Sequence, residues 1–162
     1  MKYHSTHPTG TKSQPRKEKI RIGWTEIIEF PDWGITALEA KVDTGARTSA
    51  LHVENLQKFT DGTIAFDVII SQKHPVQTVH IRAPLLKIGR IRSSTGRYTT
   101  RCFIKTKVKI GPILKEIEIS LISREKMTFR MLLGRKAIGR HFLVDVSRRN
   151  LLNLRKINTA QP

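Results

Sequence analysis

Short runs of hydrophobic residues that alternate with polar ones follow one another along most of the chain. Turn signals such as Pro31-Asp32 and Asp61-Gly62 separate these runs. Alternation with a period of two predicts strands that bury one face, and Gly, Pro and Asp between them predict the connecting turns. We expect strands at residues 20–24, 27–30, 35–42, 51–56, 64–70 and 76–81.

The clearest alternation lies in the second half of the chain. Over residues 102–110 mostly apolar side chains alternate with three lysines, and over residues 117–121 they alternate with glutamate and serine. Gly111-Pro112 between the two runs is a turn signal. The pattern predicts an antiparallel hairpin with one buried face and with lysines opposite glutamates on the other. Only residues 135–142 have a helical pattern, so we expect an all-β barrel or sandwich with one short helix.

The first 19 residues differ in composition from the rest. They are rich in Ser, Thr, Pro, His and Lys and almost lack large apolar side chains. Such a segment cannot offset the entropy of ordering it, so residues 1–19 are predicted to form a disordered basic tail and residues 20–162 one domain. We interpret His4 and His7 in this tail as exposed histidines, because a metal site would need further ligands nearby.

Length and composition limit the class of protein. A chain of 162 residues with 38% hydrophobic residues fits one globular domain with a core. Its apolar runs are far shorter than the roughly 20 residues of a membrane span, and its first residues contain no apolar stretch typical of a secretory signal. The single cysteine, Cys102, excludes an internal disulfide framework and a Cys-based zinc module. The sequence therefore predicts a soluble, cytoplasmic protein without a membrane partner.

The charge is strongly positive, with 30 Lys and Arg against 13 Asp and Glu and a formal net charge of +17. Such a chain attracts phosphate backbones whatever its fold. The basic residues are spread along the whole chain, and no helix-turn-helix, finger, KH or RRM signature accompanies them. We therefore expect non-specific binding of polyanions, and a basic nucleic-acid-binding protein remains an alternative function.

One short motif can carry chemistry. Asp43-Thr44-Gly45 directly follows an apolar run that ends at Val42. Glycine lets the backbone approach the carboxylate and threonine supplies a hydroxyl, so the backbone can hold an acid in place here. The triplet alone is more typical of an ordinary turn between two strands. A second element adds weight, because residues 131–135 (MLLGR) predict an apolar strand that enters the short helix through Gly134 and Arg135.

Together these elements resemble the retropepsin fold of aspartic proteases. That fold has an early D-T-G-A loop, a late [IL]-[IL]-G-R junction and a flap hairpin between them, whose place residues 91–97 take here. More narrowly, Gly23-Trp24, residues 41–52 (KVDTGARTSALH) and residues 129–135 (FRMLLGR) are similar to the bacterial retropepsin-like family that has also been labelled ATP-dependent zinc protease. The resemblance spans about residues 20–155 and implies a closed, all-β barrel with one short C-terminal helix.

The resemblance implies an aspartic endopeptidase in which Asp43, Thr44 and Gly45 form the catalytic motif. Two carboxylates about 3 Å apart cannot both ionise, so they share one proton, and the ionised one activates water. Because one chain supplies a single Asp-Thr-Gly, the second Asp43 must come from a symmetry mate in a homodimer. Thr44 would link the two loops across the two-fold axis, and the loop would rest on Leu133, Gly134 and Arg135.

The residues expected to bind a peptide or protein substrate are Ala46, Arg47, Arg92, Ser93, Ser94, Gly96 and Arg101. Arg47 departs from viral retropepsins, in which acidic or small residues follow the D-T-G-A motif. A guanidinium beside Asp43 would favour two ionised carboxylates, which works against a shared proton. With Arg97, the arginines near the flap would attract an acidic substrate, or they are simply solvated at strand edges. Both interpretations stay open.

We expect no cofactor and no metal. The sequence has neither a G-x-x-x-x-G-K-[ST] phosphate loop nor an H-E-x-x-H motif, and the spacing of His52, Cys102 and His141 does not indicate zinc. Members of the resembled family occur beside ATP-grasp glutamate ligases, which links the resemblance to the modification of peptide tails. A catalytically silent peptide-binding module of the same fold is a further alternative.

Overall fold

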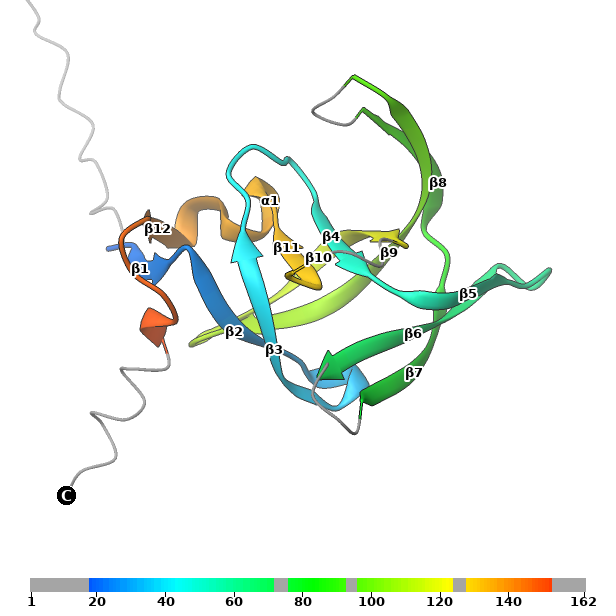
Figure 1. Ribbon diagram of the computed structural model, residues 1–162, viewed down its shortest axis with the longest axis horizontal. Coiled ribbons are helices and arrows are strands. Elements are labelled where there is room, and N and C mark those ends of the chain that lie inside the picture. The colour runs from blue at the N-terminus through cyan, green and yellow to red at the C-terminus, as the bar shows by residue number, and fades with distance from the viewer. Residues whose placement is uncertain (1–17, 72–75, 93–95, 124–127, 153–162) are drawn as a thin grey trace, which may run out of the picture.

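The computed structural model describes residues 18–71, 76–92, 96–123 and 128–152. Most of this part of the chain is β-structure, with one short α-helix, which confirms the all-β prediction (Figure 1). The tail predicted over residues 1–19 falls outside the described residues up to residue 17.

Most strands follow the alternating runs of the sequence, but the one strand predicted over residues 51–56 is divided into two strands that belong to different sheets. The strands are β1 (Ile20–Gly23), β2 (Thr25–Phe30), β3 (Ile35–Val42), β4 (Ser49–His52), β5 (Glu54–Lys58), β6 (Thr63–Ser71), β7 (Gln77–Pro84), β8 (Lys87–Arg92), β9 (Tyr98–Ile110), β10 (Ile113–Ile122), β11 (Met131–Leu133) and β12 (Phe142–Asp145). The helical elements are the α-helix α1 (Arg135–Ile138) and two short 3-10 turns, η1 (Pro31–Trp33) and η2 (Gly139–His141).

The helix predicted over residues 135–142 is shorter than expected. α1 ends at Ile138, and the next residue, Gly139, has a positive φ of 47° that a continuing helix does not accommodate. The turn η2 follows, and Phe142 already begins β12. β12 pairs in parallel with β1 in a small sheet of its own.

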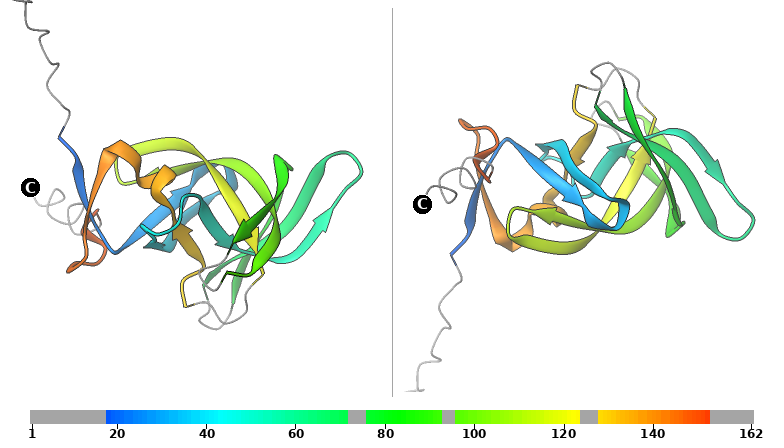
Figure 2. Two further views of the ribbon diagram at one scale, coloured as in Figure 1. Left: turned by 90° about the horizontal axis from the view of Figure 1, so that it is seen from above. Right: turned by 90° about the horizontal axis from the view of Figure 1, so that it is seen from below.

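The largest sheet places the Asp-Thr-Gly loop. Its strand order is β10-β4-β11-β3-β2-β9-β8, and β10 also pairs with β9, so the pairings lead from β9 around the sheet and back to β9. β11 lies between β3 and β4, parallel to the first and antiparallel to the second. The loop that joins β3 to β4 therefore passes over the end of β11. The β1–β12 sheet and the β5-β6-β7 sheet lie at opposite ends of the molecule's long axis (Figures 1 and 2).

The hairpin of β9 and β10 forms as the alternation predicts. Cys102, Ile104 and Val108 on β9 are buried, and the two strands are antiparallel over their whole pairing. The charge pairing is only partly the predicted one, because β9 also neighbours β2 and β8. Lys105 contacts Glu116 across the hairpin at 3.5 Å. Outside this pair, the lysines reach acids on other elements, as Lys109 does with Glu29 at 3.1 Å.

The base of β8 is tied to the same hairpin. Lys87 Nζ lies 2.7 Å from the Glu118 carboxylate on β10, and its hydrogen bond lowers the pKa of Glu118. Opposite Lys87 in register, Phe103 is buried, and its ring lies against the backbone of Gly89. The first residues of β8 are therefore packed against β9 and β10, and the rest of the strand extends away from them.

A buried carboxylate anchors the end of the described chain. Glu26 on β2 is fully buried and accepts hydrogen bonds from the backbone N–H groups of Gly23 (2.7 Å), Leu151 (3.0 Å) and Leu152 (3.2 Å). Leu152 in turn packs into the core and lies against Gly111. This one side chain thus fastens the segment after β12 across the corner between β1 and β2.

We expect Glu26→Gln to lower the free energy of unfolding by about 2–4 kcal/mol. The glutamine amide offers a single acceptor oxygen, so at least one buried backbone N–H group loses its partner and meets an NH₂ group instead. The matched control is Glu116→Gln, which removes an exposed carboxylate and is expected to cost less than about 1 kcal/mol. Equal shifts of the urea midpoint in the two variants would contradict the anchoring role.

Candidate active site

The loop between β3 and β4 holds Asp43 by backbone contacts. The Asp43 N–H donates to the Leu133 carbonyl of β11 at 2.9 Å. Asp43 Oδ1 accepts hydrogen bonds from the N–H groups of Gly45 (3.1 Å) and Ala46 (3.2 Å). Oδ2 has no hydrogen-bond partner within the described ranges, and the side chain is half-buried. One carboxylate oxygen is therefore fixed by the turn and the other is available to a ligand.

The helix α1 supports this loop from the side. Its first two N–H groups donate to the carbonyls of Ala46 and Arg47, at 2.9 and 3.0 Å. Arg135 Nη1 donates to the carbonyls of Thr44 and Gly45, both at 2.9 Å. Four consecutive carbonyls of the loop are thus bound by one short helix, which restricts the loop to one conformation.

Gly134 lies directly against the loop. A Cβ atom at this buried position would lie 2.6 Å from the Thr48 carbonyl carbon and 2.8 Å from its oxygen. The Gly134 N–H donates to Ser49 Oγ at 3.1 Å, and the Ser49 carbonyl accepts from Ser120 Oγ at 3.2 Å. The close approach of two backbones at this point therefore requires a glycine.

Lys115 of β10 fixes the other end of α1. Its ammonium group donates to the carbonyls of Lys136 (3.1 Å) and Ala137 (3.0 Å). Burial, and secondarily the positive charge of Arg140, lower the pKa of Lys115. Hydrogen bonds therefore hold α1 at both ends, and the Asp43 loop rests on a fixed element. Nothing in the sequence singles out Lys115, because its partners are backbone atoms of a segment about twenty residues away.

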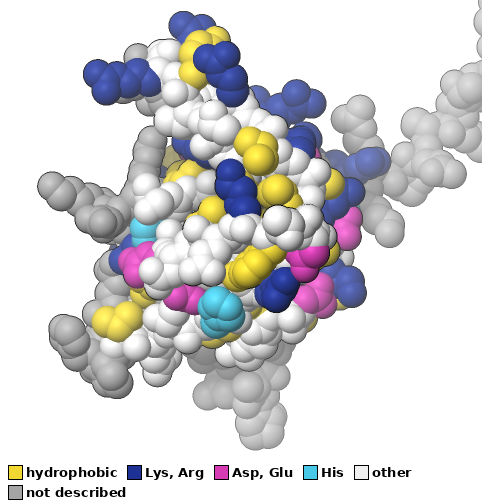
Figure 3. Space-filling model, turned by 90° about the vertical axis from the view of Figure 1, so that its right-hand side faces the viewer, with side chains coloured by type: hydrophobic (Ala, Val, Ile, Leu, Met, Phe, Trp, Pro, Cys, Tyr) yellow, Lys and Arg dark blue, Asp and Glu magenta, His cyan; other side chains and the backbone are white. Residues whose placement is uncertain are grey.

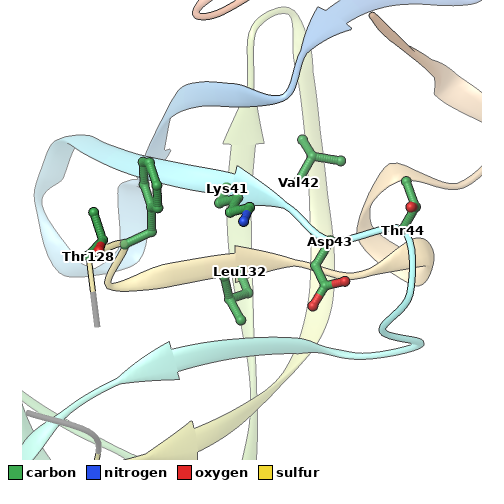
Figure 4. A pocket seen from close by; sticks show the side chains of 7 residues that line it. Lys41, Val42, Asp43, Thr44, Thr128 and Leu132 are labelled. Carbon is green, nitrogen blue, oxygen red and sulfur yellow. The ribbon is translucent and has the colours of Figure 1, made fainter. Parts of the chain in front are cut away.

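Asp43 borders a pocket of about 490 Å³ (Figure 4). The pocket is lined by Lys41, Val42, Asp43, Thr44, Thr128, Phe129 and Leu132. In Figure 4 the Asp43 carboxylate and the Thr44 side chain point in opposite directions from the loop. Thr44 is exposed, and its hydroxyl has no hydrogen-bond partner among the described residues.

Five of these lining residues were not among the predicted site residues: Lys41, Val42, Thr128, Phe129 and Leu132. Strand alternation could have found Lys41, because residues two apart on one strand share a face and Asp43 directly follows β3. Val42 is the direct neighbour of Asp43 in the sequence. The remaining three depend on the register of β11 against β3, which pairs Leu132 with Lys41. No local pattern in the sequence predicts this pairing.

The predicted flap corresponds to the hairpin of β8 and β9, which projects toward the same side of the molecule as the β3–β4 loop in Figure 1. Figure 3 shows Lys and Arg side chains gathered at the end of this hairpin, at the top of that view. Gly96 has a φ of +82° in the connecting turn. Ser93 and Ser94 lie outside the described residues.

The arginines of the hairpin do not all share one face. Arg92 is opposite Tyr98, and Arg101 is opposite Gly89. Because alternate residues of a strand point to opposite faces, Arg92 lies on the face that continues to the buried Cys102, and Arg101 lies on the other. Arg92 and Arg101 therefore do not line one surface together. Arg90, which was not among the predicted site residues, shares the face of Arg92, and its guanidinium lies 4.8 Å from the Tyr98 ring.

Arg47 is exposed and makes no ion pair with Asp43, and both residues belong to the described part of the chain.

Among described residues, no three His, Cys, Asp or Glu side chains gather in a group that could hold a metal ion. His52 and Cys102 are buried, whereas His141 is exposed. No helix within the described ranges is long and apolar enough to cross a membrane.

A mostly β fold with an Asp-Thr-Gly loop, supported by an apolar strand, a glycine and an Arg-led helix, defines the retropepsin-like class of proteins. A comparison with protein families agrees, since residues 21–153 match the RimB-like family, described as retropepsin-like aspartic endopeptidase RimB. The chain belongs to this family.

Curated proteins with similar sequences are named as ligases and not as endopeptidases. The chain is 38% identical over 141 residues to a probable alpha-L-glutamate ligase of Desulfotalea psychrophila, covering 82% of this chain and 29% of that protein. Proteins of the same name from Shewanella halifaxensis and Parasynechococcus marenigrum are 36% and 35% identical over 80% and 78% of the chain. The chain thus spans less than a third of the length of these relatives.

A solved structure has the same fold. It is a protein of unknown function from Legionella pneumophila, with a TM-score of 0.68 and 22% identity. The match covers 83% of this chain and 99% of that one. At this identity, the likeness concerns the fold alone.

Proposed function

We propose that the chain is an aspartic endopeptidase that acts as a homodimer, with one Asp43 from each chain in a shared dyad. The observation that carries this proposal is the geometry of the loop. Backbone amides hold Asp43 Oδ1, and Oδ2, at the edge of a pocket, has no hydrogen-bond partner among the residues that the structure describes. The pairings form a closed circuit of six strands, β9-β10-β4-β11-β3-β2 and back to β9. We further infer that this circuit is the closed barrel of retropepsins.

In the proposed reaction, the two carboxylates share one proton because their charges repel each other. The ionised Asp43 removes a proton from water, and the water oxygen attacks the scissile carbonyl carbon. The partner's Asp43, which carries the shared proton, donates a hydrogen bond to the carbonyl oxygen as that oxygen becomes negative. The C–N bond then breaks as the nitrogen receives a proton, which yields a carboxylic acid and an amine.

The second chain also gives Thr44 a role. Its hydroxyl is exposed and has no hydrogen-bond partner in the part of the chain that the structure describes, and it belongs to the loop that would meet its symmetry mate. A two-fold axis beside the loop would bring two such hydroxyls and two Asp43 carboxylates together.

We propose that the substrate is an acidic peptide. Arg47, Arg90 and Arg92 are exposed on the loop and hairpin that project to one side of the molecule. The relatives are named for the ligation of glutamate. A peptidase segment within such a protein would meet peptides that carry added glutamate residues. Positive charge near the site would then raise the rate of their association.

The proposal is tested by incubating the purified chain with glutamate-rich reporter peptides and analysing the products by mass spectrometry. We expect two products whose masses sum to the substrate plus one water. Because the site needs two chains, activity per chain should fall on dilution in parallel with the dimer fraction measured by sedimentation. Undiminished activity per chain in a monomeric sample would contradict the shared dyad. Peptide binding without cleavage across the pH range would favour a silent peptide-binding module.

A further inference from the structure

Lys41 is the basic residue among those that line the pocket beside Asp43. It lies on the same face of β3 as Glu39, and Asp43 continues that face beyond the end of the strand. Residues two apart on a strand are separated by about 7 Å, so the three charges form a row along the face. The row brings an ammonium group next to the carboxylate assigned to the chemistry.

The two acids in this row have partners, whereas Lys41 has no charged partner in the described part of the chain. Glu39 Oε1 accepts a hydrogen bond from Arg149 at 3.0 Å, and Asp43 Oδ1 accepts the two loop amides. Lys41 is exposed and forms no ion pair with any residue that the structure describes. Its charge is therefore available to a ligand in the pocket.

The other walls of the pocket suit an aliphatic stem. Leu132 is next to Lys41 across the β11–β3 pairing, and the Phe129 ring is held by an edge contact with Trp24, at 5.9 Å between centroids. Figure 4 shows Lys41 and Leu132 together beside Asp43. A site with apolar walls and one ammonium group matches a side chain of a few methylene groups that ends in a carboxylate.

We propose that this pocket receives an acidic side chain of the residue beside the scissile bond, glutamate in preference to its uncharged analogue, and that Lys41 sets this preference. The inference rests on the proposed peptidase function. An ionised carboxylate in the pocket would otherwise be repelled by the Asp43 pair, which carries a net negative charge. Lys41 both attracts the ligand and offsets that repulsion.

The test compares two peptides that differ only by Glu or Gln at a single position, scanned along the sequence around the cleavage site. At the position that enters the pocket, the natural chain should favour Glu about tenfold in kcat/KM. Lys41→Met should reduce this ratio to about one or below, and Lys41→Arg should restore most of it. The matched control is Lys58→Met, an exposed lysine on β5 in the separate three-stranded sheet, which should retain the ratio. An unchanged ratio in Lys41→Met would overturn the proposal.

A binding measurement separates this inference from the peptidase proposal. Fluorescence anisotropy with Asp43→Asn and the labelled Glu and Gln peptides needs no cleavage. A preference for Glu that disappears in Asp43→Asn/Lys41→Met would support the Lys41 assignment even if no peptide is ever hydrolysed. Equal affinities of Asp43→Asn for the two peptides at every position would refute the assignment, whatever the activity.

Discussion

Asp43→Asn is expected to lower kcat/KM for peptide cleavage at least about a thousandfold while the fold and the dimer persist. An amide of the same shape keeps an oxygen for the N–H groups of Gly45 and Ala46, so the loop retains its hydrogen bonds. It cannot take a proton from water, and it also removes the repulsion between two carboxylates. The dimer should therefore be as stable as before or slightly more so.

The control for Asp43→Asn is Asp32→Asn, which removes an exposed carboxylate of η1 paired with Lys107 at 3.8 Å. We expect this variant to cleave like the natural chain. Thermal melting and sedimentation show whether each variant is folded and dimeric. Full activity of a folded Asp43→Asn dimer would remove Asp43 from the chemistry.

Gly134→Leu is expected to lower the free energy of unfolding by about 3 kcal/mol or more, or to prevent folding. Even the first side-chain atom would lie 2.6 Å from the Thr48 carbonyl carbon, and both partners in this contact are backbone. Neither can move without disturbing β4 or the hydrogen bonds from α1 to the loop. Activity should fall with stability because the Asp43 loop rests on this contact.

The matched control is Gly62→Leu. Gly62 has a positive φ of 80° but open space around it, so the cost there is backbone strain of about 1–2 kcal/mol. Urea unfolding of both variants separates a contact at position 134 from the general effect of replacing a glycine. Similar losses of stability at the two positions would mean that Gly134 does not support the loop by close packing.

Much of the fold could be predicted because its signals are local. The alternation over residues 102–110 and the turn at Gly111-Pro112 define the β9–β10 hairpin without any knowledge of the rest. Asp43-Thr44-Gly45 and the run from Met131 to Arg135 are likewise contiguous motifs. The helix end at Gly139 and the strand β12 were missed, since β12 is four residues long and its partner β1 lies more than a hundred residues away.

The candidate site was only partly predictable for the same reason. The Asp43 loop is local, whereas Phe129 and Leu132 reach the pocket through the pairing of β11 with β3. Arg92 and Arg101 look equivalent in the sequence, and only the register of β8 against β9 assigns them to opposite faces of the hairpin. Long-range strand register is the quantity that composition and periodicity leave open.

The shared dyad is tested most directly by mixing the natural chain with Asp43→Asn in varied proportions and allowing the chains to exchange. If each site needs both carboxylates, activity should follow the square of the natural fraction, so an equal mixture keeps about a quarter of the activity. A linear decline, with about half the activity in the equal mixture, would mean that each chain works alone and would contradict a dyad built from two chains.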